Sequence, residues 1–421
     1  MEKKSVAILV GGGPAPGING VISAVAIEAT NRGHKVLGVH SGFKLLSKGD
    51  DSCLEHLCID SVSRIPREGG SVLGTSRANP TKDPQMLKNV VEVLEQHNVG
   101  YLVTIGGDDT ANSASAVNRA ANGRISVGHV PKTIDNDLPL HGNDSTFGFQ
   151  TACEAGTHIV QTLQTDAKTT GRWYLVVAMG RKAGHLALGI GVSAGATLTI
   201  IPEDFDNKTI HVSEIADRIL AMIIKRLAMN RAFGVVVLAE GLAEILDPDS
   251  VPELSTAERD PHGHIRFAEV DIGHIIKNAV KNRLSRLGLT QVTIVDKNVG
   301  YELRCGSPIA FDRIYTQQLG YGIIDFLLAG GNGAMISRRD GVLVPIPFDE
   351  LIDPQTGKTR IRMVSKDSAT YQVARKYMIR LTKKDLNDSG LVAKMASIAM
   401  VSPEQLIEMF DPIADSEFGY C

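Results

Sequence analysis

Cysteine is scarce in this sequence, and the few cysteines present form no obvious pairs. The five residues include no C-x-x-C spacing and are odd in number: Cys53, Cys58, Cys153, Cys305 and Cys421. Such a pattern argues against both a disulfide framework and a structural zinc site. It is typical of the reducing cytoplasm, which is where we expect this chain to act.

Excess charge and long apolar runs are absent as well. The net charge is −3 at pH 7 and the isoelectric point lies near 6.5, which leaves no basic field for nucleic acid or an anionic membrane. No stretch approaches the ~20 apolar residues of a membrane span, and the N-terminal residues lack the apolar core of a signal peptide. Nucleic-acid and membrane partners are therefore not expected.

What the sequence does contain is apolar material for two domains. Of its 421 residues, 43% are hydrophobic, and strand-like and helix-like segments alternate up to about residue 340. Strands are expected at residues 5–10, 34–40, 101–105, 125–130, 173–178, 197–201, 233–239 and 291–295, and helices at 18–31, 84–97, 148–166, 211–230, 268–287 and 311–329. The alternation predicts an α/β fold: two Rossmann-like parallel-sheet domains with the active site in the cleft between them. We expect domains over residues 1–150 and 151–340, and a C-terminal helical extension over 341–421 that packs on the core.

Glycines and charged residues recur at the carboxyl ends of the expected strands. After the first strand, Gly11–Gly17 lead into a helix, where backbone N–H groups and the helix dipole favour an anion. The spacing matches neither G-x-G-x-x-G nor a P-loop, so a phosphate cradle and a plain tight turn stay equally open. Asp108 and Asp109 follow Gly106-Gly107 at another helix start, and they fit a helix cap as well as a magnesium site.

The densest group of charges follows the strand expected at residues 125–130. The stretch Pro131-Lys132-Thr133-Ile134-Asp135-Asn136-Asp137 places one cation and two carboxylates on the loop that leaves this strand. Taken alone, such a stretch is more often a solvated turn. Its position at the carboxyl end of a strand, where open α/β sheets bind their ligands, favours a functional role.

Five sequence blocks, in one order along the chain, resemble the phosphofructokinase family. They are G-G-x-A-P-G at 12–17, G-G-D at 106–108, T-I-D-N-D at 133–137, M-G-R at 179–181 and G-S-P-x-x-x-D-R at 306–313. The resemblance spans roughly residues 5 to 340. The residues beyond it have no counterpart in the short bacterial ATP-dependent enzymes of the family.

The resemblance implies phosphoryl transfer to fructose 6-phosphate, a reaction that needs positioning, charge neutralisation and a base for the attacking hydroxyl. Asp135 matches the family's proton acceptor for the C1 hydroxyl, and Asp137 its supporting carboxylate. Asp108 matches the residue that binds Mg²⁺, an ion that prefers hard oxygen ligands. Gly12 and Gly13 are expected to offer backbone N–H groups to the donor phosphates.

The resemblance also assigns residues to the acceptor. Those expected to bind fructose 6-phosphate are Thr133, Asp135, Asp137, Met179, Gly180, Arg181, Glu240, Tyr301 and Arg304, and Arg181 also holds the transferring group. Arg172 matches an arginine that reaches the sugar phosphate from a neighbouring subunit, which implies a homo-oligomer, either a dimer or a tetramer. The domain at residues 1–150 is then the donor-binding domain, and that at 151–340 binds fructose 6-phosphate.

Departures from the ATP-dependent pattern identify the expected donor. Asp109 replaces a glycine, and its carboxylate would repel the α-phosphate of ATP by ~4 kcal/mol at about 4 Å and an effective dielectric near 20. Lys132 also replaces a glycine and would neutralise charge that develops on a pyrophosphate leaving group. Both changes, together with Tyr301-Glu302-Leu303-Arg304 and Pro14, are similar to the pyrophosphate-dependent branch of the family.

The sequence therefore predicts a magnesium-dependent, reversible transfer from pyrophosphate to fructose 6-phosphate, in glycolysis or gluconeogenesis. The alternatives are an ATP-dependent enzyme and a catalytically silent sugar-phosphate-binding paralogue.

Overall fold

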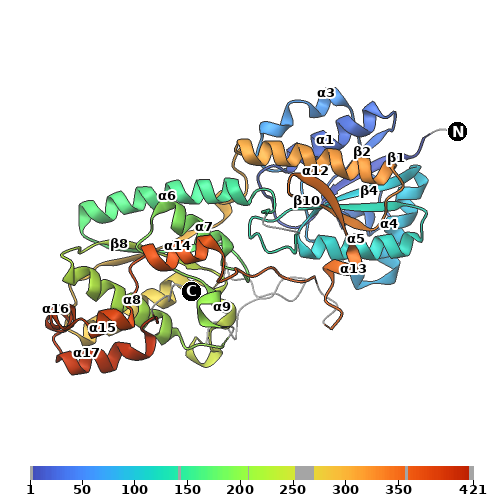
Figure 1. The fold of residues 1–421 in the computed structure, drawn as a ribbon. Coiled ribbons are helices and arrows are strands. Elements are labelled where there is room, and N and C mark those ends of the chain that lie inside the picture. The colour runs from blue at the N-terminus through green and yellow to red at the C-terminus, as the bar shows by residue number, and fades with distance from the viewer. Residues whose placement is uncertain (1–2, 141–143, 207, 252–269, 356–358, 417–421) are drawn as a thin grey trace. The chain divides into compact units, whose positions relative to one another are not determined.

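The computed structural model describes residues 3–140, 144–206, 208–251, 270–355 and 359–416. Within these ranges the chain forms two compact units. Unit 1 contains residues up to 152 together with 301–362, and unit 2 contains the described parts of 153–300 together with the chain after 362. Figure 1 labels the elements of both. No helix in the described ranges has the length and apolar character needed to cross a bilayer.

Unit 1 is built on a seven-stranded sheet with the order β11-β10-β5-β4-β1-β2-β3. The five inner strands run parallel: β1 (Ser5–Val10), β2 (Val36–Val39), β4 (Val99–Gly106), β5 (Ser126–Pro131) and β10 (Ala334–Arg339). The two edge strands, β3 (Leu54–Leu57) and β11 (Val342–Pro347), are antiparallel to their neighbours. The sheet is therefore mixed, although its centre is parallel as predicted.

Helices cover both faces of this sheet, and the alternation along β1 shows why. Val6, Ile8 and Val10 join one core cluster with α1 (Ile18–Asn31) and α12 (Ala310–Leu328). The intervening Ala7 and Leu9 join a second cluster with α4 (Pro84–Gln96) and α5 (Asp108–Ala121). Successive strand side chains point to opposite faces, so a wholly apolar strand must be covered twice. Figure 1 shows α1 and α12 lying side by side, as their shared core requires. Short helices complete the unit: α2 (Phe43–Leu46), α3 (Ile59–Val62) and α13 (Phe348–Leu351).

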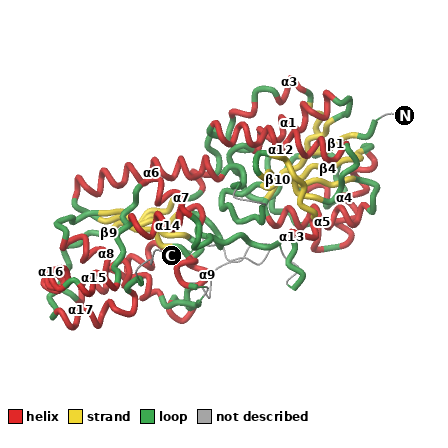
Figure 2. The backbone as a smooth tube through the Cα atoms, in the orientation of Figure 1, coloured by secondary structure: helices red, strands yellow, loops and turns green. Residues whose placement is uncertain are grey.

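Unit 2 is built on a separate four-stranded parallel sheet, visible as the second group of strands in Figure 2. Its order is β7 (Leu198–Ile200), β8 (Gly234–Ala239), β6 (Trp173–Ala178) and β9 (Ile294–Val299). Its longer helices are α6 (Phe149–Thr170), α7 (His185–Ala194), α8 (Val212–Ala228) and α11 (Ile272–Arg286). The C-terminal helices are α14 (Ala369–Tyr377), α15 (Lys383–Asn387), α16 (Ser389–Ala399) and α17 (Pro403–Phe410), and α9 (Leu242–Ile245) is a short turn after β8. Helix α14 packs on α7, and α16 packs on α8.

The predicted α/β class with two parallel-sheet halves is confirmed. Strands at residues 5–10 and 173–178 and the helix at 18–31 have the predicted bounds. The strand expected at 291–295 instead spans Ile294–Val299, and the start expected at residue 268 for the preceding helix, α11, lies outside the described residues.

The division of the chain differs from the predicted boundaries. Residues 301–340, expected in the second domain, belong to unit 1, because β10 pairs with β5 and because Tyr315, Leu319 and Ile323 of α12 are buried against α1. The predicted extension at 341–421 is itself divided, since β11 completes the sheet of unit 1 and the helices after residue 362 pack in unit 2. Sequence periodicity predicted these helices and strands, but it did not predict which of the two units each belongs to.

Candidate active site

Three loops of unit 1 begin side by side at the carboxyl ends of its central strands. Strands β5, β4 and β1 are neighbours, and the registers Val10↔Ile105 and Gly106↔Pro131 align their carboxyl ends. The glycine loop at residues 11–17, the Gly106–Asp109 turn and the loop at residues 132–137 therefore start next to one another. This is the arrangement that open parallel sheets use to bind ligands.

Close packing explains the glycines at the start of two of these loops. A Cβ atom built on Gly11 would lie 2.4 Å from Oγ1 of Thr110, and one built on Gly106 would lie 2.3 Å from the same atom. Gly12 has a φ of 78°, and its amide donates a hydrogen bond to the carbonyl of Ser76 at 2.9 Å. Of the two amides expected to bind phosphate, that of Gly12 is therefore already engaged within the protein.

Lys132 reaches from its own loop to the glycine loop. Its side chain is buried, its backbone N–H donates to the carbonyl of Gly106 at 2.8 Å, and its ammonium donates to the carbonyl of Gly13. A Cβ atom on Gly12 would lie 3.4 Å from Nζ. Lys132, the cation that distinguishes this sequence from the ATP-dependent pattern, is thus held at the loop expected to bind the donor.

Arg304 approaches the same glycine loop. A Cβ atom on Gly13 would lie 3.3 Å from Cζ of Arg304, and the ring of Tyr301 lies 5.1 Å from that carbon. Tyr301 is 63% exposed, so its ring is available to a ligand. The side chains of Lys132 and Arg304 therefore both lie beside the glycine backbone of this loop. Two cations next to a backbone without side chains are a suitable environment for a phosphate.

A buried histidine, which the sequence analysis missed, supports the Gly106 turn. Nε2 of His129 lies 3.1 Å from the carbonyl oxygen of Gly106, and Nδ1 lies 2.8 Å from Oγ1 of Thr104. A carbonyl can only accept, so Nε2 carries the hydrogen and Nδ1 accepts from the threonine hydroxyl. Burial lowers the pKa of His129 to about 3, and the charge of Lys132 contributes to that shift. His129 is therefore neutral at physiological pH, and a lone histidine within an apolar strand gives no motif by which to find it.

Asp108 and Asp109 are the first two residues of α5, and both are partly buried. No group of three His, Cys, Asp or Glu ligand atoms gathers at Asp108 in the described part of the chain. Mg²⁺ is usually bound by only one or two carboxylates together with substrate phosphates and water. Asp108, beside a basic glycine loop, therefore fits a magnesium site that is completed by a phosphorylated substrate.

The loop at residues 133–137 is held by a network of its own. Oγ1 of Thr133 accepts from the amide of Asp135 at 3.0 Å, and the carbonyl of Thr133 accepts from Oγ1 of Thr146 at 2.6 Å. Asn136 has a left-handed φ of 57°, and its Oδ1 accepts from the amide of Thr146 at 3.0 Å. Asp135 remains partly exposed, whereas Asp137 is buried. The two carboxylates therefore differ in access, and the roles predicted for them stay predictions.

In unit 2 the ends of β6 and β8 bring together four predicted residues. The amide of Gly180 donates to Oε2 of Glu240 at 3.1 Å, and the amide of Glu240 donates to the carbonyl of Ala178 at 2.9 Å. A Cβ atom on Gly241 would lie 3.1 Å from the carbonyl oxygen of Arg181. Met179, Gly180, Arg181 and Glu240 thus form one local group.

Arg172 is not part of that group. It precedes β6, whereas Met179 follows it, so the six-residue strand of about 20 Å separates the two. Its nearest acidic neighbour is Asp166, with Nε and Oδ2 3.9 Å apart. A contact of Arg172 with a neighbouring subunit stays a prediction.

A buried carboxylate explains the last sequence block. Asp312, on α12, accepts hydrogen bonds from the amides of Gly148 and Thr151 at 2.9 Å each and from Oγ1 of Thr151 at 2.5 Å. These donors belong to the start of α6, so Asp312 caps that helix from outside. Burial raises the pKa of Asp312, and the three hydrogen bonds oppose that change. The aspartate of G-S-P-x-x-x-D-R is therefore an anchor between two helices.

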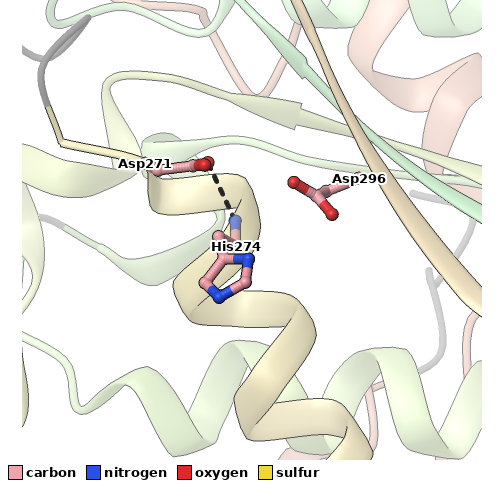
Figure 3. Close-up of side chains that lie close together, drawn as sticks. All are labelled: Asp271, His274 and Asp296. Carbon is pink, nitrogen blue, oxygen red and sulfur yellow. Dashed lines mark hydrogen bonds between the residues drawn. The ribbon is translucent and has the colours of Figure 1, made fainter.

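Figure 3 shows a second group of potential metal ligands, Asp271, His274 and Asp296 in unit 2, whose ligand atoms lie within 4.8 Å of one another. Asp271 accepts from the backbone amide of His274 at 3.0 Å and so caps α11. Asp296 accepts from the ammonium of Lys277. Because one carboxylate is a helix cap and the other is paired with a cation, we assign no metal to this group.

Comparison with known proteins adds independent findings. The family model described as Phosphofructokinase matches residues 5–327. The chain is 52% identical over 415 residues to the pyrophosphate–fructose 6-phosphate 1-phosphotransferase of Naegleria fowleri, covering 96% of this chain and 95% of that protein. It is 49% identical over 403 residues to the protein of that name from Thermotoga maritima, covering 94% and 96%. The solved pyrophosphate-dependent phosphofructokinase of Marinobacter aquaeolei matches with a TM-score of 0.65 at 17% identity, over 95% of this chain and 92% of that one, which supports the fold.

Proposed function

Because the chain belongs to the phosphofructokinase family, we propose that it transfers a phosphoryl group from pyrophosphate to the C1 hydroxyl of fructose 6-phosphate. The products are fructose 1,6-bisphosphate and phosphate. Donor and product have similar bond energies, so the reaction runs in both directions and serves glycolysis or gluconeogenesis. Relatives about half identical over nearly the full chain bear the name of this activity.

The contact of Lys132 with the glycine loop is the observation that carries the choice of donor. Its ammonium donates a hydrogen bond to the carbonyl of Gly13, within the loop that is expected to bind the donor. A pyrophosphate leaving group has no nucleoside contacts to hold it, so positive charge at the donor loop must both bind it and stabilise it as it departs. Asp109 adds the negative charge that disfavours the α-phosphate of ATP.

Members of the family generally use a divalent metal, and Mg²⁺ is the ion we assign here. Asp108 would hold it, together with pyrophosphate oxygens. When bound, the ion would neutralise charge on the donor phosphates. His129 supports the turn that carries Asp108, because its Nε2 donates a hydrogen bond to the carbonyl of Gly106.

On the acceptor side, Asp135 takes the proton of the C1 hydroxyl as its oxygen attacks phosphorus. The new P–O bond forms while the bridging P–O bond of pyrophosphate breaks, and phosphate leaves with the electron pair. Asp137 supports Asp135, and Thr133, Tyr301 and Arg304 bind the sugar phosphate. In unit 2, Met179, Gly180 and Arg181 bind the sugar phosphate and the transferring group, and Glu240 accepts from sugar hydroxyls. We further propose a cytoplasmic homo-oligomer in which Arg172 serves a neighbouring subunit.

A coupled assay with pyrophosphate or ATP as donor, at the same magnesium concentration, tests this function. We expect turnover with pyrophosphate and little with ATP. A preference for ATP would refute the donor assignment, and binding of fructose 6-phosphate without turnover of either donor would identify a silent paralogue.

Variants of the donor loop test the reasoning behind that choice. Lys132→Met should lower kcat with pyrophosphate by about 100-fold or more, whereas the exposed Lys48→Met serves as a matched control and should not. The double variant Asp109→Gly, Lys132→Gly should raise the use of ATP. Unchanged ATP affinity in that variant would contradict the charge argument.

A further inference from the structure

The segment Thr359–Arg362 contacts two loops of the candidate site, the Gly106–Asp109 turn and the loop at residues 132–137. It lies beyond residue 327, where the family match ends. It returns from β11 and α13: Thr359 forms an antiparallel bridge with Ile352, and the amide of Arg360 donates to the carbonyl of Leu351 at 2.8 Å. All of these residues belong to unit 1. The segment lies in the part of the chain that the sequence predicts as a C-terminal helical extension.

Arg362 donates three hydrogen bonds to the loop that carries Asp135 and one to Asp144. Its backbone amide donates to the carbonyl of Asp137 at 2.8 Å, and its Nε donates to the carbonyl of Asn136 at 3.2 Å. Nη1 donates to the carbonyl of Asp144 at 2.8 Å, and Nη2 donates to Oδ1 of Asn136. The guanidinium therefore contacts Asn136 and Asp144, two residues eight positions apart in the chain, at the same time.

The geometry of these contacts requires an arginine. A guanidinium presents several N–H donors in one rigid plane, whereas a lysine ammonium is a single point. Three different acceptors on two parts of the chain use that plane here. Burial lowers the pKa of Arg362, but the negative charges of Asp137 and Asp144 oppose the change, and an arginine remains protonated in any case.

Arg362 binds a residue with a left-handed backbone. Asn136 stands between Asp135 and Asp137 with a φ of 57°, a conformation that asparagine adopts more readily than most residues and that the surrounding contacts hold in place. Both the carbonyl and the side-chain amide oxygen of Asn136 accept from Arg362. Because the two aspartates flank this residue, its backbone conformation sets the direction in which each carboxylate leaves the chain.

The same segment also contacts the turn that carries the expected metal ligand. Oγ1 of Thr359 donates to the carbonyl of Asp108 at 3.3 Å. Within unit 1, one short stretch of chain therefore contacts both the donor-side carboxylate turn and the acceptor-side loop.

We propose that Arg362 is a positioning residue for phosphoryl transfer, which holds Asn136 in its left-handed conformation and thereby aims the carboxylate of Asp135 at the acceptor hydroxyl. This role rests on the proposed function and extends it to a residue outside the matched family region. Arg362 touches neither substrate in this scheme. Its loss should therefore reduce kcat much more than it weakens the binding of fructose 6-phosphate.

The test compares three variants with the wild-type enzyme, using pyrophosphate as donor. Arg362→Met removes the guanidinium, Arg362→Lys keeps the charge but loses the planar donors, and Arg360→Met is the matched control, because Arg360 is exposed two residues earlier on the same segment. For each variant, kcat is normalised to folded enzyme, the thermal unfolding midpoint is recorded, and the Kd for fructose 6-phosphate is measured without donor. Added guanidinium chloride at low millimolar concentration tests rescue of Arg362→Met.

We expect kcat to fall by about 100-fold in Arg362→Met, the order of effect that a misplacement of about 1 Å can cause. Arg362→Lys should be intermediate, guanidinium should restore part of the lost rate, the Kd for the sugar phosphate should change less than threefold, and Arg360→Met should match wild type. A kcat per folded enzyme within threefold of wild type in Arg362→Met would overturn the proposal, as would an equal loss in sugar-phosphate binding. If wild-type enzyme itself fails to turn over pyrophosphate, the proposed function is overturned first and the kinetic role of Arg362 with it.

Discussion

The buried His129 should make unit 1 sensitive to acid, and replacing it with glutamine should remove that sensitivity. Nε2 of the histidine donates to the carbonyl of Gly106, and the side-chain amide of glutamine can donate from a similar position. His129→Gln therefore keeps the support of the Asp108 turn while eliminating the titrating group. The change removes the hydrogen bond from Thr104 to Nδ1.

The size of the effect follows from the pKa of about 3 in the folded protein and about 6.5 in an unfolded chain. Because the folded value is the lower one, the unfolded state takes up a proton as the pH falls below 6.5 and the folded state does not. Stability is therefore fully present above that pH and is lost progressively toward pH 3. The slope approaches about 1.4 kcal/mol per pH unit, which amounts to about 2 kcal/mol between pH 6.5 and pH 4.5.

Two measurements check this reasoning. Urea unfolding of wild type and His129→Gln at a series of pH values should give curves that diverge by about that amount on acidification, since every other titrating group is common to both. NMR of protein labelled at its twelve histidines, with His129 assigned by its absence from the variant, should show one imidazole that stays neutral down to pH 4.5. Parallel stability curves, or a His129 signal that titrates above pH 5, would refute the argument.

Asp312→Ala should lower stability by about 3 kcal/mol or more, because it leaves the buried amides of Gly148 and Thr151 without an acceptor; an unchanged urea midpoint would contradict the capping role. Gly69→Ala should raise the KM for fructose 6-phosphate about tenfold while the protein stays folded, because its Cβ would lie 1.9 Å from the carbonyl oxygen of Cys305 and must displace the segment that carries Arg304; wild-type kinetics would show that Arg304 is positioned independently. Chelation with EDTA should abolish turnover, and Asp108→Asn should raise the magnesium concentration for half-maximal activity at least tenfold; equal magnesium dependence in variant and wild type would exclude Asp108 as a ligand.

Much of the local structure could be predicted from the sequence because it depends on local patterns. The wholly buried strands Ser5–Val10 and Trp173–Ala178 are predicted with their observed bounds, since a strand covered by helices on both faces reads as a nearly continuous apolar run. The glycine turn at Gly106 and the charged loop from Lys132 to Asp137 were also predicted at strand ends, because turn residues and charges mark the points at which such strands stop.

Several features of the site have no local signature, and only the tertiary structure decided them. The sequence by itself determined the α/β class, the order of strands and helices, and the residue types expected to bind the two phosphorylated substrates. It could not determine that α12 and β10 belong to unit 1, that His129 supports the turn before Asp108, or that Arg362 binds Asn136. Each of these depends on contacts between distant parts of the chain, and such contacts are fixed by packing and hydrogen bonding in the folded molecule rather than by the spacing of residues along it.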